Sequence, residues 1–382
     1  MGQSQTLCFL HPAFSAGNRR KRHGHGHSRR VRRVPRPRLA NTQTAHRLIF
    51  DLAGQERDDL LALLDRAKRA LGHTGQGQVL VMTRDDVIAA FNAIRVWQNG
   101  DRRAVHKPLL VLLALSRVND VASQKMDWNE AEPLLKSLLE EFGPDGSSST
   151  RHYPFWHLQT DGLWQLDGPA EILNRPPGAT PTLTELRQNH VRGGFATPIY
   201  KALKADPELI AIVAQRIVDA HFPESIRGDV LDAVGLAQLE LTGSARDQQR
   251  RRDPAFRAKV LMAYQYRCAV CGHDLRMGQQ SIGLEAAHIK WFQANGPDEV
   301  PNGIAMCSLH HKVFDLGAFK ILPGTYQMVF SQHLNGSEAA SHRMLAYHGH
   351  GMILPQAQEY RPHPANLDWH ARQVFKNPAR GD

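Results

Sequence analysis

The sequence predicts an α+β protein of two domains. The first is mainly helical and has short strands, and the second is smaller and rich in loops. Three observations support this fold class. Apolar residues recur at helical spacing through much of the first two thirds of the chain. Short aromatic runs interrupt that pattern, and two Cys-x2-Cys/His pairs mark the last third.

Composition and charge divide the chain into six ranges. Residues 1–45 are rich in Arg, His, Gly and Pro and contain no acidic residue, so we expect a disordered basic tail. The other ranges are a helical extension at 46–82, an upstream domain at 83–241, a linker at 242–252, a downstream domain at 253–336 and a C-terminal extension at 337–382.

The net charge of +10 is concentrated in the N-terminal region. Eleven of the 47 Lys and Arg residues lie between Arg19 and Arg47, which leaves 36 against 37 Asp and Glu residues in the rest of the chain. A basic tail adds salt-dependent, sequence-independent affinity for DNA. The alternative is an extension without function, produced by a start codon assigned too early. The remainder of the chain is therefore nearly neutral and has no general excess of positive charge.

Cellular location follows from apolar runs and cysteine usage. The chain has no run of about 18 apolar residues, which argues against a membrane span. Its N-terminal apolar stretch is short and broken by Pro12, so it makes a poor secretory signal. Three of the four cysteines lie in one short region, which favours a metal site in a reducing compartment. We therefore expect a cytoplasmic protein with no membrane partner.

Capping signals delimit the expected helices. Thr83 is a good N-cap for a helix that ends near Val96, and Asp253-Pro254 opens a helix that ends near Tyr266. The other predicted elements are an apolar helix after Lys107-Pro108, helices at 131–142, 206–220 and 223–236, and strands at 153–158 and 162–166.

Paired cysteine and histidine residues indicate a structural zinc site. Cys268 and Cys271 form one x2-spaced pair, and Cys307 and His310 form another after a gap of 35 residues. Four ligands of this kind suit a tetrahedral Zn²⁺, which would hold together a module with little core of its own. The alternative is three buried cysteines beside an incidental histidine, which leaves the paired spacing unexplained.

Three further residues lie between or beside these pairs, in the order histidine, asparagine, histidine. His288 lies in the apolar strand Leu-Glu-Ala-Ala-His-Ile, Asn302 precedes a glycine, and His311 lies in His-His-Lys-Val-Phe-Asp. This order resembles the HNH nuclease family, in the branch found in restriction endonucleases, over about residues 255–330. The resemblance implies a ββα-metal fold with one histidine on a strand and another on a helix.

The resemblance also implies a role for each residue in phosphodiester hydrolysis. His288 would be the general base for the attacking water. Asn302 would orient His288 or hold the loop between the strands, and His311 would bind a catalytic Mg²⁺ or Mn²⁺. Because His310 and His311 point about 100° apart on a helix, one can face the zinc and the other the active site.

One position departs from the family pattern. Many members have an acidic metal ligand directly before the first histidine, where this chain has Ala287. Glu285 lies two residues earlier and points to the same side of a strand, so we expect it to be the second metal ligand. The alternative is that Glu285 only hydrogen-bonds a histidine or an arginine. Asp315, one turn beyond His311, is a weaker candidate that could instead cap local structure.

The upstream domain contains three motifs that resemble one family when taken together. His-Lys-Pro-Leu-Leu at 106–110 is a basic turn entering an apolar helix, which can present cations to a phosphate. Tyr-Pro-Phe-Trp-His-Leu at 153–158 and Asp-Gly-Leu-Trp at 161–164 alone are more typical of a core. Over about residues 84–200 the set resembles the sulfur-binding domain that precedes an HNH nuclease in phosphorothioate-dependent restriction enzymes.

That resemblance implies recognition of DNA in which sulfur replaces a non-bridging phosphate oxygen. Sulfur is larger and more weakly hydrated than oxygen, so an apolar pocket can prefer it. Matching positions assign Tyr153, Pro154 and His157 to the sulfur pocket, although the family usually has a small residue near the position of His157. The other assignments are His106 and Lys107 at the modified phosphate, Arg103 at a neighbouring phosphate, and Arg187, Asn189 and Arg192 at base edges.

The sequence leaves three hypotheses open. The first is a phosphorothioate-dependent restriction endonuclease that acts on double-stranded DNA. The second is an HNH endonuclease whose upstream domain reads methylated or unmodified DNA. The third is a zinc-dependent DNA-binding protein that does not cut, against which the intact His288, Asn302 and His311 weigh. A homodimer is one arrangement that would supply the two active sites a double-strand break usually needs.

Overall fold

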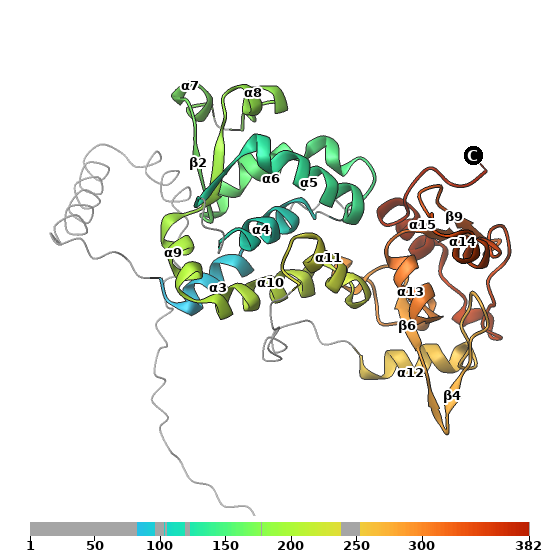
Figure 1. Cartoon of the computed structure of the whole chain (residues 1–382). Coiled ribbons are helices and arrows are strands. Elements are labelled where there is room, and N and C mark those ends of the chain that lie inside the picture. Colours follow the sequence, from blue (N-terminus) through green and yellow to red (C-terminus); the bar gives the residue numbers. More distant parts are fainter. Residues whose placement is uncertain are drawn as a thin grey trace, which may run out of the picture. The chain divides into compact units, whose positions relative to one another are not determined.

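A buried helix, α4 (His106–Ser116), lies at the centre of the upstream domain (Figure 1). Every residue from Pro108 to Leu115 is buried, and a helix that is apolar on all sides must be covered on all sides. Helices α5 (Trp128–Phe142), α6 (His152–His157) and α10 (Pro207–His221) pack against it. The apolar helix expected after Lys107-Pro108 is therefore confirmed.

The computed structural model describes residues 82–95, 103, 105–118, 123–176, 178–237 and 253–381. The predicted basic tail, nearly all of the helical extension and the linker at 242–252 lie outside the described residues. All described residues belong to one compact unit that runs from Gln78 to Asp382. Among them, no helix combines the length and apolar character needed to cross a membrane.

Side-chain caps begin several helices of the upstream domain. Thr83 and Asp86 form a reciprocal capping box at the start of α3 (Arg84–Asn92), as its sequence predicts, but the helix ends before Val96.

The remaining helices and 3-10 turns of the upstream domain are short. They are α7 (Ala170–Leu173), α8 (Leu183–Gln188), α9 (Thr197–Ala205), α11 (Arg227–Ala233), η1 (Ser147–Thr150), η2 (Leu158–Asp161) and η3 (Glu224–Ile226). The single helix expected at 223–236 is thus divided into η3 and α11.

A three-stranded antiparallel sheet covers one side of this domain. Its order is β1 (Lys125–Asp127), β3 (Arg192–Phe195) and β2 (Trp164–Asp167). The central strand contains Gly193, where a Cβ atom would lie 2.6 Å from Trp164 Nε1 and 2.7 Å from Phe155 Cζ. A glycine is needed there because aromatic rings pack directly against the backbone.

The strand predicted at 153–158 is wrong, because the segment is the helix α6. Its aromatic residues favour a strand locally, but Pro154 lies in the first turn of the helix, where no backbone N–H is required. Phe155 is buried against Trp128 and Trp164, with ring centroids 4.8 and 5.8 Å away. Packing of this kind outweighs the local preference.

The downstream domain contains two antiparallel strands followed by a helix. Strand β6 (Leu284–His288) pairs with β7 (Gly303–Cys307), and α13 (Ser308–Asp315) follows directly. Helix α12 (Pro254–Ala263), capped by Asp253, also packs on both strands. This arrangement and the upstream domain confirm the predicted α+β class.

Shorter elements complete the downstream domain. They are the strands β4 (Arg276–Met277), β5 (Gln280–Ser281), β8 (Phe319–Ile321) and β9 (Met328–Phe330), the helices α14 (Glu338–Leu345) and α15 (Pro364–Gln373), and the 3-10 turns η5 (Phe292–Ala294), η6 (Val300–Asn302) and η7 (Gln358–Tyr360). Trp291, Trp369 and Val374 join the apolar core of the upstream domain. The two domains therefore share buried surface.

Candidate functional site

Three cysteines and one histidine meet at the junction of β7 and α13. The ligand atoms of Cys268, Cys271, Cys307 and His310 lie within 4.8 Å of one another. His310 Nδ1 is 3.6 Å from Cys268 Sγ and 3.2 Å from Cys307 Sγ. Such separations fit donors arranged around one tetrahedral ion at bond lengths of about 2.0–2.3 Å. The structure confirms the predicted grouping as a Cys3His cluster that can hold a metal ion.

The local fold explains how these four residues meet. Cys307 ends β7, and His310 lies one turn into the helix that begins at the next residue. The backbone N–H of Ala269 donates to the carbonyl of Ala305 at 2.8 Å, which fastens the first pair to β7. The hydrogen bond between Cys268 and Cys307 lowers the pKa of Cys268 and raises that of Cys307, and burial raises that of Cys271, so the first thiolate of the cluster forms at Cys268.

Glu285 and His311 meet between β6 and α13. Glu285 Oε2 lies 2.6 Å from His311 Nδ1, and the Ser308 hydroxyl donates to Glu285 Oε1 at 2.7 Å. The hydrogen bond with His311 holds the pKa of Glu285 below its usual value. One carboxylate oxygen and one imidazole nitrogen are thus hydrogen-bonded to each other, as in the alternative role considered for Glu285, and binding of a metal by Glu285 stays a prediction.

Asp315 approaches the other ring nitrogen of His311. Its Oδ2 atom lies 3.1 Å from His311 Nε2, one helical turn away on α13. Burial alone would lower the pKa of His311, but the charges of Asp315 and Glu285 outweigh burial and raise it to about 10. His311 is therefore held between two carboxylates, one on each ring nitrogen.

His288 ends β6 and is held in place from two directions. Its ring stacks on Phe256 of α12, with centroids 4.1 Å apart and planes 18° from parallel. Its Nε2 atom lies 2.8 Å from Asp298 Oδ1, and the other oxygen of Asp298 accepts the backbone N–H of Asp253 at 2.7 Å. The carboxylate thus fixes both the position and the orientation of the imidazole.

Asn302 is fully buried and fastens the loop between β6 and β7. Its Oδ1 accepts the backbone N–H of Lys290 at 2.9 Å. Its Nδ2 donates to the carbonyls of Lys290 at 3.0 Å and Pro297 at 2.9 Å. Of the two roles that the sequence allowed, these contacts correspond to holding the loop.

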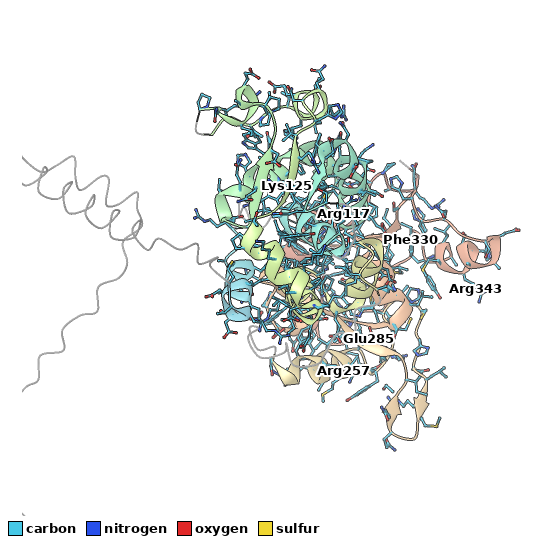
Figure 2. All side chains as sticks on the ribbon, turned by 60° about the vertical axis from the view of Figure 1, so that its left-hand side comes forward. Arg117, Lys125, Arg257, Glu285, Phe330 and Arg343 are labelled. Atoms are coloured by element: carbon cyan, nitrogen blue, oxygen red, sulfur yellow. The ribbon has the colours of Figure 1, made fainter. Side chains whose placement is uncertain are left out.

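Two residues near these side chains were not identified from the sequence. Asp298 follows an Asn-Gly-Pro turn, where an acidic residue usually only faces solvent. Arg257 on α12 donates to the carbonyl of Leu284 at 2.8 Å, and its charge contributes to the lowered pKa of Glu285. Both Arg257 and Glu285 are labelled in Figure 2. An exposed arginine next to the Glu285–His311 pair can neutralise a phosphate.

The upstream domain presents Tyr153 and His157 on one face of α6. These residues are one turn apart, with ring centroids separated by 6.1 Å. Tyr153 is 47% exposed, whereas Pro154 is buried. His157 Nε2 lies 2.8 Å from the hydroxyl of Thr180, which fixes the orientation of the ring. An exposed aromatic ring thus lies beside a half-buried one.

The N-terminus of α4 lies next to this face. Lys107 Nζ pairs with the buried Asp161 at 2.5 Å, and its charge contributes to lowering the pKa of His157. His106 Nε2 lies 2.9 Å from the carbonyl of Ser147 and 3.1 Å from Thr150 Oγ1. A helix N-terminus with a lysine in its first turn attracts an anion.

The histidines around this face are neutral at pH 7. Burial lowers the pKa of His106, and it also lowers the pKa of His152 with help from the charge of Arg151. Burial and then the charge of Lys107 lower the pKa of His157. The positive charges next to α6 therefore come from Lys107 and Arg151, and the imidazoles add polarisable ring surface.

Four other predicted DNA contacts have partners within the protein. Arg103 donates to the carbonyl of Phe142 at 2.6 Å and lies 3.9 Å over the ring of Trp291. Arg187 pairs with the buried Glu132, Asn189 donates to the carbonyl of Glu185 at 2.8 Å, and Arg192 donates to Ser123 at 2.7 Å. The structure does not bring Arg103 to the α6 face, and DNA contacts by all four remain predictions.

Each of the two domains contains a segment that matches the model of a known family. Residues 84–239 match the family model described as ScoMcrA-like, DNA sulfur-binding domain. Residues 268–321 match the model of the HNH endonuclease family. A search of curated proteins finds no match.

Similar solved structures include two sulfur-binding domains. The sulfur binding domain of ScoMcrA complexed with phosphorothioated DNA is 24% identical with a TM-score of 0.35, over 39% of this chain and 94% of that chain. The corresponding SprMcrA complex is 20% identical with a TM-score of 0.34, over 41% of this chain and 96% of that chain.

A longer enzyme is also similar. The type IV phosphorothioation-dependent restriction endonuclease ScoMcrA is 25% identical with a TM-score of 0.33, over 39% of this chain and 32% of that chain. The match thus spans about a third of that enzyme. Because these TM-scores lie below 0.5, the domain assignment rests on the family models.

Proposed function

We propose that the two domains of this chain act together as one modification-dependent restriction endonuclease. The upstream domain matches the ScoMcrA-like DNA sulfur-binding domain, and the downstream domain matches the HNH endonuclease family. The upstream domain binds double-stranded DNA that carries a phosphorothioate, and the downstream domain hydrolyses a phosphodiester bond nearby. The observation that carries the proposal is the presence of both family matches in one chain, with the reading domain first. We expect this activity in the cytoplasm.

The α6 face supplies the chemistry that sulfur recognition requires. The exposed ring of Tyr153 and the imidazole of His157 offer a weakly polar surface, which favours a weakly hydrated sulfur atom over a phosphate oxygen. Pro154, the third residue predicted for the pocket, is buried and supports this surface from within the domain. Lys107 supports the charge of the phosphate itself, together with the N-terminus of α4. Because Lys107 already has an acidic partner in Asp161, its attraction for modified and unmodified phosphates is weakened alike, and the preference for sulfur has to come from the α6 face.

Two different metal sites follow from the donor atoms. The Cys3His cluster suits Zn²⁺, which prefers sulfur and imidazole nitrogen in a closed tetrahedral site. Glu285 and His311 offer one oxygen and one nitrogen, which suits Mg²⁺ or Mn²⁺ with the remaining positions left for water and DNA oxygens. When bound there, this ion neutralises charge on the scissile phosphate and on the leaving 3′ oxygen.

The residues of the chain supply the proton transfer and the positioning. We assign His288, which Asp298 holds in place, as the general base that accepts the proton of the attacking water. Water attacks phosphorus, and the bond to the 3′ oxygen breaks. Asn302 keeps the loop closed beside His288, and Arg257 supports the charge on phosphorus from the side of Glu285.

A cleavage assay tests this function. Matched duplexes with one Rp phosphorothioate, one Sp phosphorothioate or no sulfur are incubated with the full chain and Mn²⁺. We expect cutting of one sulfur stereoisomer only, and we expect His288→Ala to remove cutting while binding is retained. Equal cutting of all three duplexes would instead support an HNH endonuclease that reads methylated or unmodified DNA. Absence of cutting on every duplex would support a binding protein.

A further inference from the structure

The buried carboxylate of Asp315 connects the two domains. Its Oδ1 accepts the indole N–H of Trp291 at 2.9 Å, and its Oδ2 accepts the hydroxyl of Ser225. Ser225 belongs to η3 of the upstream domain, whereas Asp315 ends the helix that carries His311. The same Oδ2 atom lies 3.1 Å from His311 Nε2. One carboxylate oxygen therefore contacts a residue of each domain.

The surroundings hold this carboxylate in one place. Arg103 of the upstream domain stacks 3.9 Å over the ring of Trp291, and its backbone N–H donates to Gln373 at 2.9 Å. On α13, Lys312 pairs with Asp229 of the upstream domain at 2.8 Å. The helix that carries His311 is thus attached to the upstream domain at two successive turns.

A metal-binding histidine is usually oriented by an acceptor on its second ring nitrogen. Asp315 occupies that place for His311, because Nδ1 faces Glu285 and Nε2 faces Asp315. A buried carboxylate that lost one of its donors would turn toward the donors that remain. The hydroxyl of Ser225 therefore helps to set the orientation of the Asp315 carboxylate, whose Oδ2 atom contacts His311.

We propose that Asp315 is the positioning residue for His311, and that Ser225 of the upstream domain fixes Asp315, so that the sulfur-binding domain completes the metal site of the nuclease. This inference rests on the proposed function only for the identity of the site as catalytic. Its structural content is a dependence of divalent-metal affinity on a residue of the other domain.

Titration calorimetry with Mn²⁺ alone, on the full chain with its zinc cluster loaded and without DNA, tests this dependence. Glu285→Gln identifies the heat that belongs to the Glu285–His311 site, because it removes one of the two ligands. We expect Asp315→Asn to weaken that binding by about 10- to 100-fold, as for other residues that orient a metal ligand. We expect Ser225→Ala to weaken it by about 3- to 10-fold, because it acts one contact further away.

Two matched variants separate this contact from general loosening of the interface. Ser225→Thr keeps a hydroxyl and should retain the Mn²⁺ affinity of the unchanged protein. Asn377→Ala removes a different contact between the domains, the 2.6 Å hydrogen bond from Asn377 to Asp145, and should leave Mn²⁺ affinity unchanged. Phosphorothioate-duplex binding should be retained in all variants, because none changes the α6 face.

Unchanged Mn²⁺ affinity in Ser225→Ala would overturn the proposal, and so would equal losses in Ser225→Ala and Asn377→Ala. Failure of the proposed function is distinguishable from either result. The Mn²⁺ titration contains no DNA, so it still measures whether metal affinity depends on Ser225 even if the unchanged protein does not cut phosphorothioated DNA. A melting temperature equal to that of the unchanged protein verifies that each variant is folded.

Discussion

Tyr153 and His157 lie one turn apart on the same face of α6, with ring centroids separated by 6.1 Å. A strand would place residues four positions apart at about 13 Å along the chain, too far for the two rings to meet. The helix brings them together beside Lys107, whose charge is already compensated by Asp161. This pair therefore makes a compact surface suited to one polarisable atom.

The contribution of Tyr153 can be measured directly. Tyr153→Ala should weaken binding of the phosphorothioate duplex by about 10- to 100-fold, the value of burying an aromatic ring, and weaken binding of the unmodified duplex little. Because the side chain is 47% exposed, folding should be unaffected. Tyr360→Ala is the matched control, since Tyr360 is 42% exposed in the downstream domain. Equal losses on both duplexes would assign Tyr153 a general role in DNA binding.

Sulfur preference should not depend on pH near neutrality. The pKa values of His106, His152 and His157 are lowered, chiefly by burial, so all three imidazoles are mainly neutral at pH 7 and above. We expect the ratio of affinities for sulfur and oxygen duplexes to be constant between about pH 7 and 8, measured by fluorescence anisotropy at fixed ionic strength. A ratio that rises steeply as the pH falls through this range would place a protonated histidine at the phosphate.

Asp298 should affect the rate of cutting but not the binding of metal. Asp298→Asn removes the charge that orients and supports protonation of His288, so we expect the single-turnover rate to fall by about 100-fold or more. The pH dependence of the rate should also shift, whereas Mn²⁺ affinity should not. The neighbouring exposed Glu299→Gln is the control. An unchanged rate in Asp298→Asn would remove this carboxylate from the mechanism.

Removal of the metal from the Cys3His cluster should abolish cutting and spare the reading of sulfur. The cluster joins Cys268 to the start of α13, and α13 carries His311. Cys271→Ser should therefore lower the melting temperature and abolish cleavage even in excess Mg²⁺, whereas preference for the sulfur duplex is retained. Cys8→Ser provides a control outside the cluster. Full cutting by Cys271→Ser would contradict a structural role for the metal.

Much of the candidate site could be predicted because its residues are close in sequence. The spacing of Cys268, Cys271, Cys307 and His310 defines the cluster, and adjacent positions on one helix separate the direction of His310 from that of His311. Glu285 could be proposed as a metal ligand because the family resemblance puts an acidic ligand at position 287 and alternate residues of a strand share a face. Local geometry therefore gives the directions of the side chains, and the resemblance supplies the pairing of distant segments.

The remainder depends on contacts between distant segments. Asp298 meets His288 only because the loop held by Asn302 folds back over the end of β6. Arg103 precedes a basic motif and therefore resembles a phosphate ligand, but the ring of Trp291, far along the chain, packs against it. The helix α6 forms against Trp128 and Trp164, which no local pattern reveals.

The most direct test of the account is a comparison of binding to matched duplexes, with and without one Rp phosphorothioate, by the full chain at fixed salt. The fixed salt concentration matters because we expect the basic N-terminal region to add salt-dependent affinity that does not depend on sulfur. A strong preference for the sulfur duplex that is lost in Tyr153→Ala is the predicted result. Equal binding of the two duplexes would contradict sulfur recognition and leave an HNH endonuclease whose target is methylated or unmodified DNA.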